Sequence, residues 1–247
     1  MTTRIDAIAV VVPAHDEEDL LAACLASLEI AVLAVRGLVE RIEVIVALDA
    51  CSDGSAQIAA AAGVGTITLG ARAVGAARSA GLDAALRSLA PIRPGRIWTA
   101  HTDADSVVPA HWLTHQLALA RAGADAVVGT VRPDFADLSA EQVDAWWATH
   151  TAGEANGHVH GANLGLRADV LLAAGGFPAI SAHEDVQLMA AVTSSGAQIV
   201  ASDAAWVRTS GRTIARAPEG YATYLRSGLL DAARDRPRVP SREISLL

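Results

Sequence analysis

The chain has 247 residues, of which 52% are hydrophobic and 19% are charged. This composition excludes a wholly disordered polypeptide and provides enough apolar material for the core of one large domain. The formal net charge of −8 argues against a nucleic-acid partner, because there is no basic excess to offset phosphates.

The number of cysteines and the length of the apolar runs bear on the cellular compartment in which the protein is expected. Cys24 and Cys51 are far apart in the sequence, so we expect two free thiols in a reducing environment. No apolar run reaches the roughly 18–20 residues of a transmembrane helix. The N-terminal apolar run is too short for a signal peptide, and no small-residue cleavage site follows it. We therefore expect a cytoplasmic protein without a transmembrane segment.

The first half of the chain alternates between strands and helices. Continuous apolar and β-branched runs predict strands at residues 7–12, 42–48, 64–69 and 96–100. Helical spacing of apolar residues predicts helices between them, at about 20–32, 54–62 and 73–89. These alternations with short connections predict right-handed βαβ units and a mostly parallel, doubly wound sheet.

The second half is less regular. Its patterns predict helices from Pro109 onward and at residues 138–150, 168–174, 183–194 and 220–233. They predict strands at residues 126–131, 164–167, 199–201 and 206–208. No internal repeat or linker is evident, so we predict one domain over residues 1–235. Residues 236–247, rich in Arg and Pro, are expected to form a C-terminal tail.

Polar or acidic residues follow each predicted strand of the first half. They lie at 15–18, 49–53, 72 and 103–105. Ligands bind at the carboxyl ends of the strands in doubly wound sheets, so we expect a ligand site there. Asp103 and Asp105 follow a buried strand, where carboxylates are costly unless something neutralises them. Mg²⁺ or Mn²⁺ carrying a phosphate would do so, and an Asp-rich turn without a ligand is the alternative.

Five segments, in order and at matching spacing, resemble family 2 glycosyltransferases of the GT-A fold. They are VVVPAHDE (10–17), ALDACSDGS (47–55), GARAVGAARSAG (70–81), TDAD (102–105) and GANLGLR (161–167) with the later GGF (175–177) and ED (184–185). The resemblance runs from about residue 6 to about residue 195. It implies a Rossmann-like α/β fold, a three-layer α/β/α sandwich around a mostly parallel sheet. It also implies a nucleotide-binding half, about 1–108, and an acceptor-binding half, about 109–235.

The resemblance assigns one group of residues to the donor, which would be a UDP- or GDP-sugar. These residues are Ala14, His15, Glu17, Asp49, Arg72, Asp103 and Ala104. Asp49 would accept a hydrogen bond from the base, and Arg72 would face the base or the diphosphate. Asp105, with Asp103, would ligate Mn²⁺ or Mg²⁺, and the metal would offset charge developing on the leaving oxygens.

The resemblance also implies how the transfer proceeds. Asp185, with Glu184 as the second candidate, would be the general base for the acceptor hydroxyl, and one-step displacement would invert the anomeric centre. The acceptor would be an unknown small molecule, glycan or lipid-linked compound, with Asn163, His183 and Trp147 as candidate contacts. A homodimer is compatible with the resemblance. For the two acids, the alternative is charge compensation at a helix N-terminus.

Two departures from the family pattern bear on the donor site. Leu48 stands where the family usually has an aspartate, which leaves the donor base open. A histidine that often completes the metal site is missing from residues 207–212. Either Asp105 and the diphosphate hold the metal with water, which we favour, or Arg208 and Arg212 supply positive charge instead. The missing histidine also keeps open a catalytically inactive nucleotide-sugar binding or scaffold protein.

Several other side chains have two interpretations. Trp146 and Trp147 either stack on a sugar or pack against the sheet, and we expect core packing for one of them. His158 and His160 alternate as in a strand, but no third ligand for a zinc site is evident. Arg78 and Asn163 are candidates for a structural role, bridging loops by hydrogen bonds.

Overall fold

The computed structural model describes residues 4–212 and 221–235. Its strands are β1 (Ala7–Ala14), β2 (Arg41–Asp49), β3 (Gly65–Leu69), β4 (Ile97–His101), β5 (Ser106–Val107), β6 (Ala126–Pro133), β7 (Leu164–Arg167) and β8 (Ile199–Thr209). Its α-helices are α1 (Leu21–Val35), α2 (Ser55–Ala61), α3 (Val74–Ser88), α4 (Trp112–Arg121), α5 (Ala140–Thr149), α6 (Ala168–Ala173), α7 (Glu184–Ser194), α8 (Tyr221–Thr223) and α9 (Leu229–Asp235). A π-helical turn, Tyr224–Gly228, joins the last two helices.

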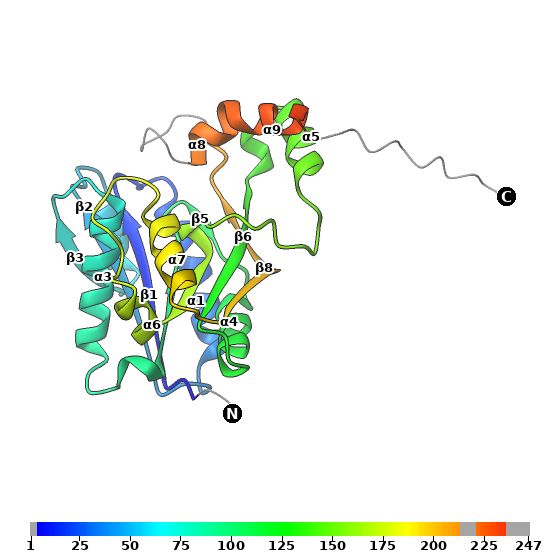
Figure 1. Cartoon of the computed structure of the whole chain (residues 1–247). Helices are drawn as coiled ribbons and strands as arrows, with labels where there is room; N and C mark the ends of the chain where they lie inside the picture. Colours follow the sequence, from blue (N-terminus) through cyan, green and yellow to red (C-terminus); the bar gives the residue numbers. More distant parts are fainter. Residues whose placement is uncertain (1–3, 213–220, 236–247) are drawn as a thin grey trace.

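The strands form one mixed sheet in the order β3-β2-β1-β4-β7-β6-β8-β5. The first four in this order pair in parallel, as the βαβ pattern predicted. Strand β7 is antiparallel to both neighbours, β6 and β8 are parallel, and β5 is antiparallel to β8. Helices α1, α2 and α4 pack on one face, and α3, α6 and α7 pack on the other (Figure 1). The predicted three-layer α/β fold is therefore confirmed.

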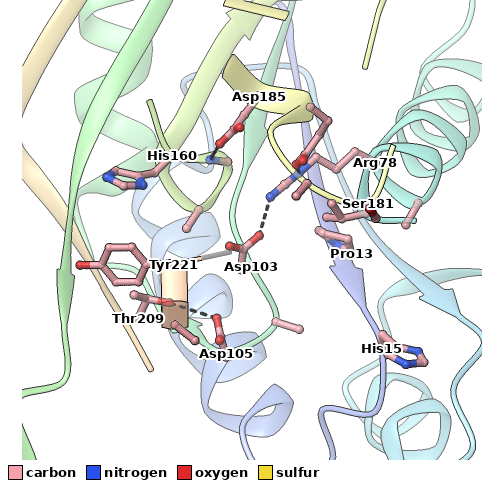
Figure 2. A pocket seen from close by; sticks show the side chains of 18 of the residues that line it. Pro13, His15, Arg78, Asp103, Asp105, His160, Ser181, Asp185, Thr209 and Tyr221 are labelled. Atoms are coloured by element: carbon pink, nitrogen blue, oxygen red, sulfur yellow. Dashed lines mark hydrogen bonds and ion pairs between the residues drawn. The ribbon is translucent and has the colours of Figure 1, made fainter. Parts of the chain in front are cut away.

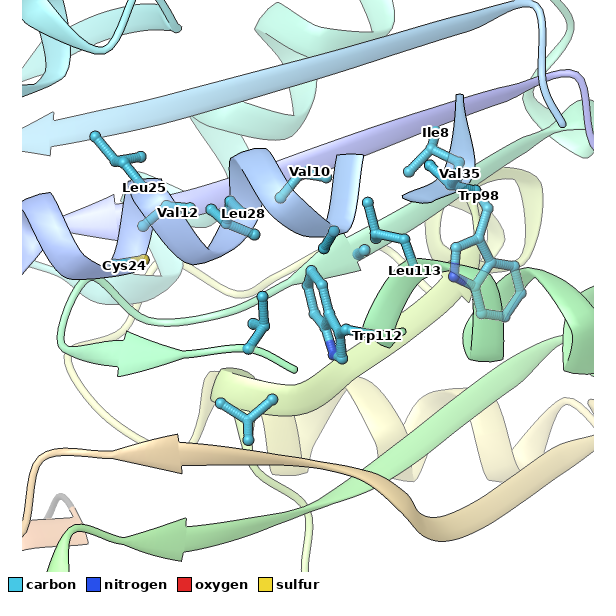
Figure 3. Close-up of a cluster of buried hydrophobic side chains, with 14 of the residues drawn as sticks. Ile8, Val10, Val12, Cys24, Leu25, Leu28, Val35, Trp98, Trp112 and Leu113 are labelled. Carbon is cyan, nitrogen blue, oxygen red and sulfur yellow. The ribbon is translucent and has the colours of Figure 1, made fainter. Parts of the chain in front are cut away.

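Strand β1 shows why a continuous apolar run marks a central strand. All eight of its residues are buried, and successive side chains face opposite layers. Ile8, Val10 and Val12 pack with α1 and α4, as Figure 3 shows, whereas Val11 packs with the helices of the other face. Because this strand is fixed on both faces, the polar loop that follows Ala14 has a defined position.

The second half differs from the prediction at β8. The strands predicted at 199–201 and 206–208 are the two ends of one strand that bends where its register against β6 shifts, between Gly129 and Val131. Polar residues in the bend, such as Ser202 and Asp203, interrupt the apolar pattern. The bend directs the end of β8 toward the end of β4, where β5 pairs with it.

Helices α5 and α9 pack against each other beyond the ends of β6 and β8, at the top of Figure 1. Their shared core contains Trp146, Leu225 and Leu229. The helix predicted at 220–233 is described from Tyr221 onward, and the predicted tail at 236–247 lies outside the described residues. Both cysteines carry free thiols, as expected. None of the helices in the described ranges combines the length and apolarity needed to cross a membrane.

Candidate functional site

A cleft of about 680 Å³ opens at the carboxyl ends of β1, β2 and β4. The start of α3, the start of α7 and the end of β8 complete its walls, and Tyr221 closes one side (Figure 2). This volume falls within the usual range of a few hundred to about 1,000 Å³ for ligand sites. The position matches the strand-end location that the sequence predicted.

Eleven of the thirteen predicted site residues line this cleft. They are Ala14, His15, Glu17, Asp49, Arg72, Asp103, Ala104, Asp105, His183, Glu184 and Asp185. Segments from the two halves of the chain therefore meet at one surface. The two predicted residues that the structure places outside the lining are Asn163 and Trp147.

Asn163 is part of the framework beneath the cleft. Its side-chain amide donates to the backbone carbonyls of Thr130 and Ala205, each at 3.0 Å. Its carbonyl oxygen accepts a hydrogen bond from the indole of Trp112 at 2.8 Å. With these three bonds made inside the protein and the side chain buried, the structure gives no support to an acceptor contact by Asn163.

The two tryptophans of α5 divide between core and surface. Trp146 is 2% exposed and packs against Leu225, which fits the expectation that one of the pair is core. Trp147 is 42% exposed and lies against Phe135 and the guanidinium of Arg132. Because Trp147 is not among the described residues that line the cleft, its predicted acceptor contact has no support in the structure.

Asp49 holds the loop at the start of α3. Its two carboxylate oxygens accept hydrogen bonds from the backbone N–H groups of Arg72, at 2.9 Å, and Ala73, at 2.8 Å. Arg72 adopts a left-handed conformation with φ of 51°, which these bonds stabilise. His15 also lines the cleft, and its Nδ1 lies 2.7 Å from the backbone oxygen of Asp49. These bonds place the Arg72 side chain at the mouth of the cleft.

Arg78, Asp103 and Glu184 form what we call the Arg78 cluster. Arg78 Nε donates to Glu184 at 2.9 Å, and Nη2 donates to Asp103 at 2.5 Å. The Arg78 side chain is only 2% exposed, and neighbouring Gly161 leaves room for it because a Cβ there would meet the guanidinium. Burial raises the pKa of Glu184 and Arg78 opposes the rise. The structural role suggested for Arg78 fits these contacts.

Asp185 is the carboxylate beside that cluster that faces the cleft. Its Oδ2 accepts a hydrogen bond of 2.5 Å from the backbone N–H of Gly161, and its Oδ1 accepts one from Val186. His183, the N-cap residue just before Glu184, adopts a left-handed conformation with φ of 62°. Figure 2 shows Asp185 and Asp105 on opposite sides of Asp103. Adjacent acids thus differ: Glu184 is held by Arg78, and Asp185 borders the open volume.

Glu17, Asp105 and Arg212 form a second group, which we call the Arg212 cluster. Nη1 and Nη2 of Arg212 donate to the two oxygens of Glu17 at 3.0 and 2.8 Å. Nη2 also lies 2.8 Å from Oδ2 of Asp105, whose Oδ1 accepts from the Thr209 hydroxyl at 3.0 Å. Burial raises the pKa of Asp105 to about 6, the charge of Asp103 adds to the rise, and Arg212 opposes it.

Arg208, the other arginine considered at the sequence level, lies elsewhere. Its side chain is half exposed and pairs with Asp134 at 3.2 Å, outside the cleft lining. Of the two arginines, Arg212 therefore supplies positive charge beside Asp105.

The Asp103–Asp105 pair meets one requirement of a divalent cation and fails another. Carboxylate oxygens suit Mg²⁺ or Mn²⁺, which are commonly held by one or two carboxylates together with substrate phosphates. In this arrangement, however, both oxygens of Asp105 already have partners, Oδ2 in Arg212 and Oδ1 in the Thr209 hydroxyl. Among the described residues, the group of potential ligands close enough for an ion is Asp16, Cys51 and Asp53, which are half-buried in the loops after β1 and β2 and include neither member of this pair.

Sequence reasoning missed an aromatic wall on one side of the cleft. Tyr221 packs edge-on against His160 at 5.4 Å and stacks with Tyr224 at 5.9 Å between ring centroids. His158 stacks on His160 at 6.1 Å, and burial lowers the pKa of His160 to about 4, so this ring is neutral at pH 7. The chain contains two tyrosines in total, and both line the cleft. Because tyrosine is so scarce in this sequence, its two tyrosines were the signal that could have indicated the aromatic wall.

Comparison with known proteins bears on the fold and the family. The Glycosyl transferase family 2 model matches residues 9–159, and no curated protein matches the chain. Staphylococcus aureus TarS 1–349 in complex with UDP-GlcNAc superposes with a TM-score of 0.59 at 16% identity, over 88% of this chain and 62% of that one. The mannosyltransferase PcManGT from Pyrobaculum calidifontis, in complex with GDP-Man and Mn²⁺, gives 0.58 at 20% identity, over 96% and 66%.

A third structure, glucosyl-3-phosphoglycerate synthase from Mycobacterium tuberculosis in complex with phosphoglyceric acid, gives a TM-score of 0.50 at 18% identity, over 81% of this chain and 71% of that one. The chain spans less than two thirds of the TarS and mannosyltransferase structures. At these identities the likeness establishes a shared fold. The family match covers more than half of the chain, so the protein belongs to glycosyl transferase family 2 and has the GT-A fold.

Proposed function

We propose that this protein transfers a sugar from a UDP- or GDP-sugar to a hydroxyl acceptor, with inversion at the anomeric carbon. One observation carries the proposal: a cleft of nucleotide-sugar size has Asp185 on one side and the guanidinium groups of Arg72 and Arg212 on others. The complexes of TarS with UDP-GlcNAc and of PcManGT with GDP-Man support a nucleotide sugar as donor.

The proposed reaction is a single displacement. The acceptor oxygen forms a bond to the anomeric carbon while the bond from that carbon to the diphosphate oxygen breaks. The acceptor proton passes to the Asp185 carboxylate, and the nucleoside diphosphate leaves with one more negative charge. The hydrogen bond from the Gly161 N–H orients Asp185 for this role. Attack opposite the leaving group inverts the configuration.

The donor site follows from the residues that line the cleft near β1 and β2. We assign Ala14, His15 and Asp49, which line the cleft, to the base and ribose, and Arg72, at its mouth, to the diphosphate. Glu17 is committed to Arg212 by two hydrogen bonds, so we assign it to charge organisation rather than to the ribose. Ala104 provides a small side chain between the two aspartates. His183 stays a candidate acceptor contact.

A divalent cation is part of the proposal through Asp105 and, more weakly, Asp103. The Mn²⁺ in the PcManGT complex supports an ion here, and Arg212 has to release Asp105 before one binds. When bound, such an ion would offset negative charge on the leaving diphosphate. The division into donor and acceptor halves, the identity of the acceptor, a homodimer and a cytoplasmic location stay predictions.

The test is release of nucleoside diphosphate from a panel of UDP- and GDP-sugars, with Mn²⁺ present. We expect wild type to release UDP or GDP from one donor class, and Asp185→Asn to lose that release while binding the same nucleotide in calorimetry. Glu141→Gln is the matched control, because Glu141 is also the second residue of a helix but lies outside the cleft lining. Failure of wild type to bind either nucleotide or turn over any donor would overturn the proposal.

A further inference from the structure

The cleft carries more negative than positive charge. Among the described residues that line it are six carboxylates and three guanidinium groups. A nucleoside diphosphate brings further negative charge into this volume, where the protein surroundings screen charges less than water does. Binding of a diphosphate therefore calls for additional positive charge, and a divalent cation is the usual source.

The position beside Asp105 is the place where a cation could supply that charge. Asp103 is already paired with Arg78, a side chain that is 2% exposed and held by a second carboxylate. Asp105 is paired with Arg212, whose side chain is 30% exposed and borders the cleft. Without Arg212, the buried Asp105 carboxylate would lie beside Glu17 and Asp103 with no positive partner, which is costly.

Release of Asp105 would disturb Arg212 little. Arg212 makes two hydrogen bonds with Glu17 in a fork-to-fork arrangement and shares one nitrogen, Nη2, with Asp105. Two-pronged arginine–carboxylate pairs are among the strongest polar contacts in proteins. The guanidinium can therefore stay on Glu17 while its contact with Asp105 breaks. The hydroxyl of Thr209 continues to hold the other oxygen of Asp105.

We propose, building on the nucleotide-sugar function above, that Arg212 is a stand-in counter-ion that couples cation binding to nucleotide binding. In the ligand-free protein the guanidinium neutralises Asp105 and opposes entry of a divalent cation. When the cation comes with a nucleoside diphosphate, the phosphates supply the negative charge that favours it, and Arg212 yields Asp105 while keeping Glu17. The cation alone is therefore a poor ligand of this protein, and the cation with nucleotide is a good one.

The test counts bound Mn²⁺ by electron paramagnetic resonance, without any turnover. We expect Mn²⁺ alone to bind Arg212→Ala at least about 10-fold more tightly than wild type, which corresponds to about 1.4 kcal/mol. Adding UDP or GDP should strengthen Mn²⁺ binding to wild type and change it less in the variant. Arg208→Ala is the matched control, because it removes an arginine of the same segment that pairs outside the cleft.

Two further variants keep the test decisive. Arg212→Gln keeps amide donors for Glu17 without the charge, and it should show the same gain if Arg212→Ala folds poorly. Asp105→Asn combined with Arg212→Ala should abolish the gained site, which separates it from Mn²⁺ bound elsewhere. Equal Mn²⁺ affinity in wild type and both Arg212 variants would overturn the inference. Absence of UDP and GDP binding would instead overturn the proposed function, while the comparison with Mn²⁺ alone still decides the role of Arg212.

Discussion

Two arginine clusters flank the Asp103–Ala104–Asp105 turn, and they use the same chemistry for different ends. In each cluster a guanidinium joins one of these aspartates to a glutamate from a distant element, Glu184 for Arg78 and Glu17 for Arg212. The Arg78 side chain is 2% exposed, whereas that of Arg212 is 30% exposed. The difference teaches that burial, not the pairing itself, separates a framework ion pair from one that a ligand can rearrange.

The Arg78 cluster fixes how helices α3 and α7 meet the end of β4. Arg78 lies on α3, Glu184 starts α7, and Asp103 follows β4. Removing the guanidinium would leave a buried carboxylate unpaired, and this costs more free energy of folding than replacing both partners by apolar groups. The Arg212 cluster joins loop ends at the cleft, where water or a ligand can replace a lost partner.

The largest expected effect is on folding. Arg78→Met should lower the free energy of unfolding by about 3–5 kcal/mol, because Glu184 loses its buried partner. Urea denaturation measures this loss. Arg208→Met is the control and should cost less than about 1 kcal/mol, since that arginine makes an exposed pair. A loss below 1 kcal/mol in the Arg78 variant would break the contrast between the two clusters.

The neighbouring acids of α7 should separate in the same way. Asp185→Asn is expected to lower release of nucleoside diphosphate by about 10²–10⁴-fold, the usual contribution of a general base, with little change in stability. Glu184→Gln is expected to destabilise the protein by about 1.5–3 kcal/mol, because it weakens a hydrogen bond between charged groups. Turnover and urea denaturation, measured on both variants, would contradict this assignment if the two effects were exchanged.

The aromatic wall predicts a pH dependence of stability. Burial lowers the pKa of His160 to about 4 in the folded protein, below its ordinary 6.5, so the unfolded chain binds this proton more readily. Above about pH 6.5 the titration of His160 leaves the free energy of unfolding at its full value. As the pH drops toward 4, this free energy falls by at most about 3 kcal/mol. Denaturation of wild type and His160→Asn between pH 4 and 7 checks this. Parallel curves for the two proteins would refute it.

The smallest expected effect lies outside the cleft. Trp147→Ala should leave the affinity for UDP or GDP unchanged and lower stability by about 1 kcal/mol or less, because its ring is 42% exposed. Trp146→Ala, which removes a buried ring, should cost about 3–5 kcal/mol. Calorimetry and denaturation on the two variants measure the difference. A selective loss of nucleotide affinity in Trp147→Ala would place that residue back at the site.

The sequence was sufficient for the parts of the site that depend on local pattern. The strands ending near Ala14, Asp49 and Asp103 are short apolar runs in parallel register, so their polar successors converge at one edge of the sheet. Glu184 and Asp185 are the first two residues of α7, and the start of a helix is likewise indicated by the local sequence pattern. In these segments a residue's place follows from its immediate neighbours.

The remaining features depend on contacts between residues far apart in the sequence. The bond between Arg212 and Glu17 spans 195 positions and requires the bend in β8, which the sequence presents as two short strands. Asn163 fits the family's motif, but its role is set by the three partners that surround it in the fold. The sequence pattern alone does not reveal whether the side chain of a motif residue lines the cleft or is buried in the core.

The most direct test is a crystal structure of wild type with Mn²⁺ and whichever of UDP or GDP binds in calorimetry. Our account predicts Mn²⁺ on the Asp105 carboxylate, with Arg212 still on Glu17 and no longer on Asp105, and the Arg78 cluster unchanged. A bound nucleotide without Mn²⁺, beside an intact contact between Arg212 and Asp105, would contradict it.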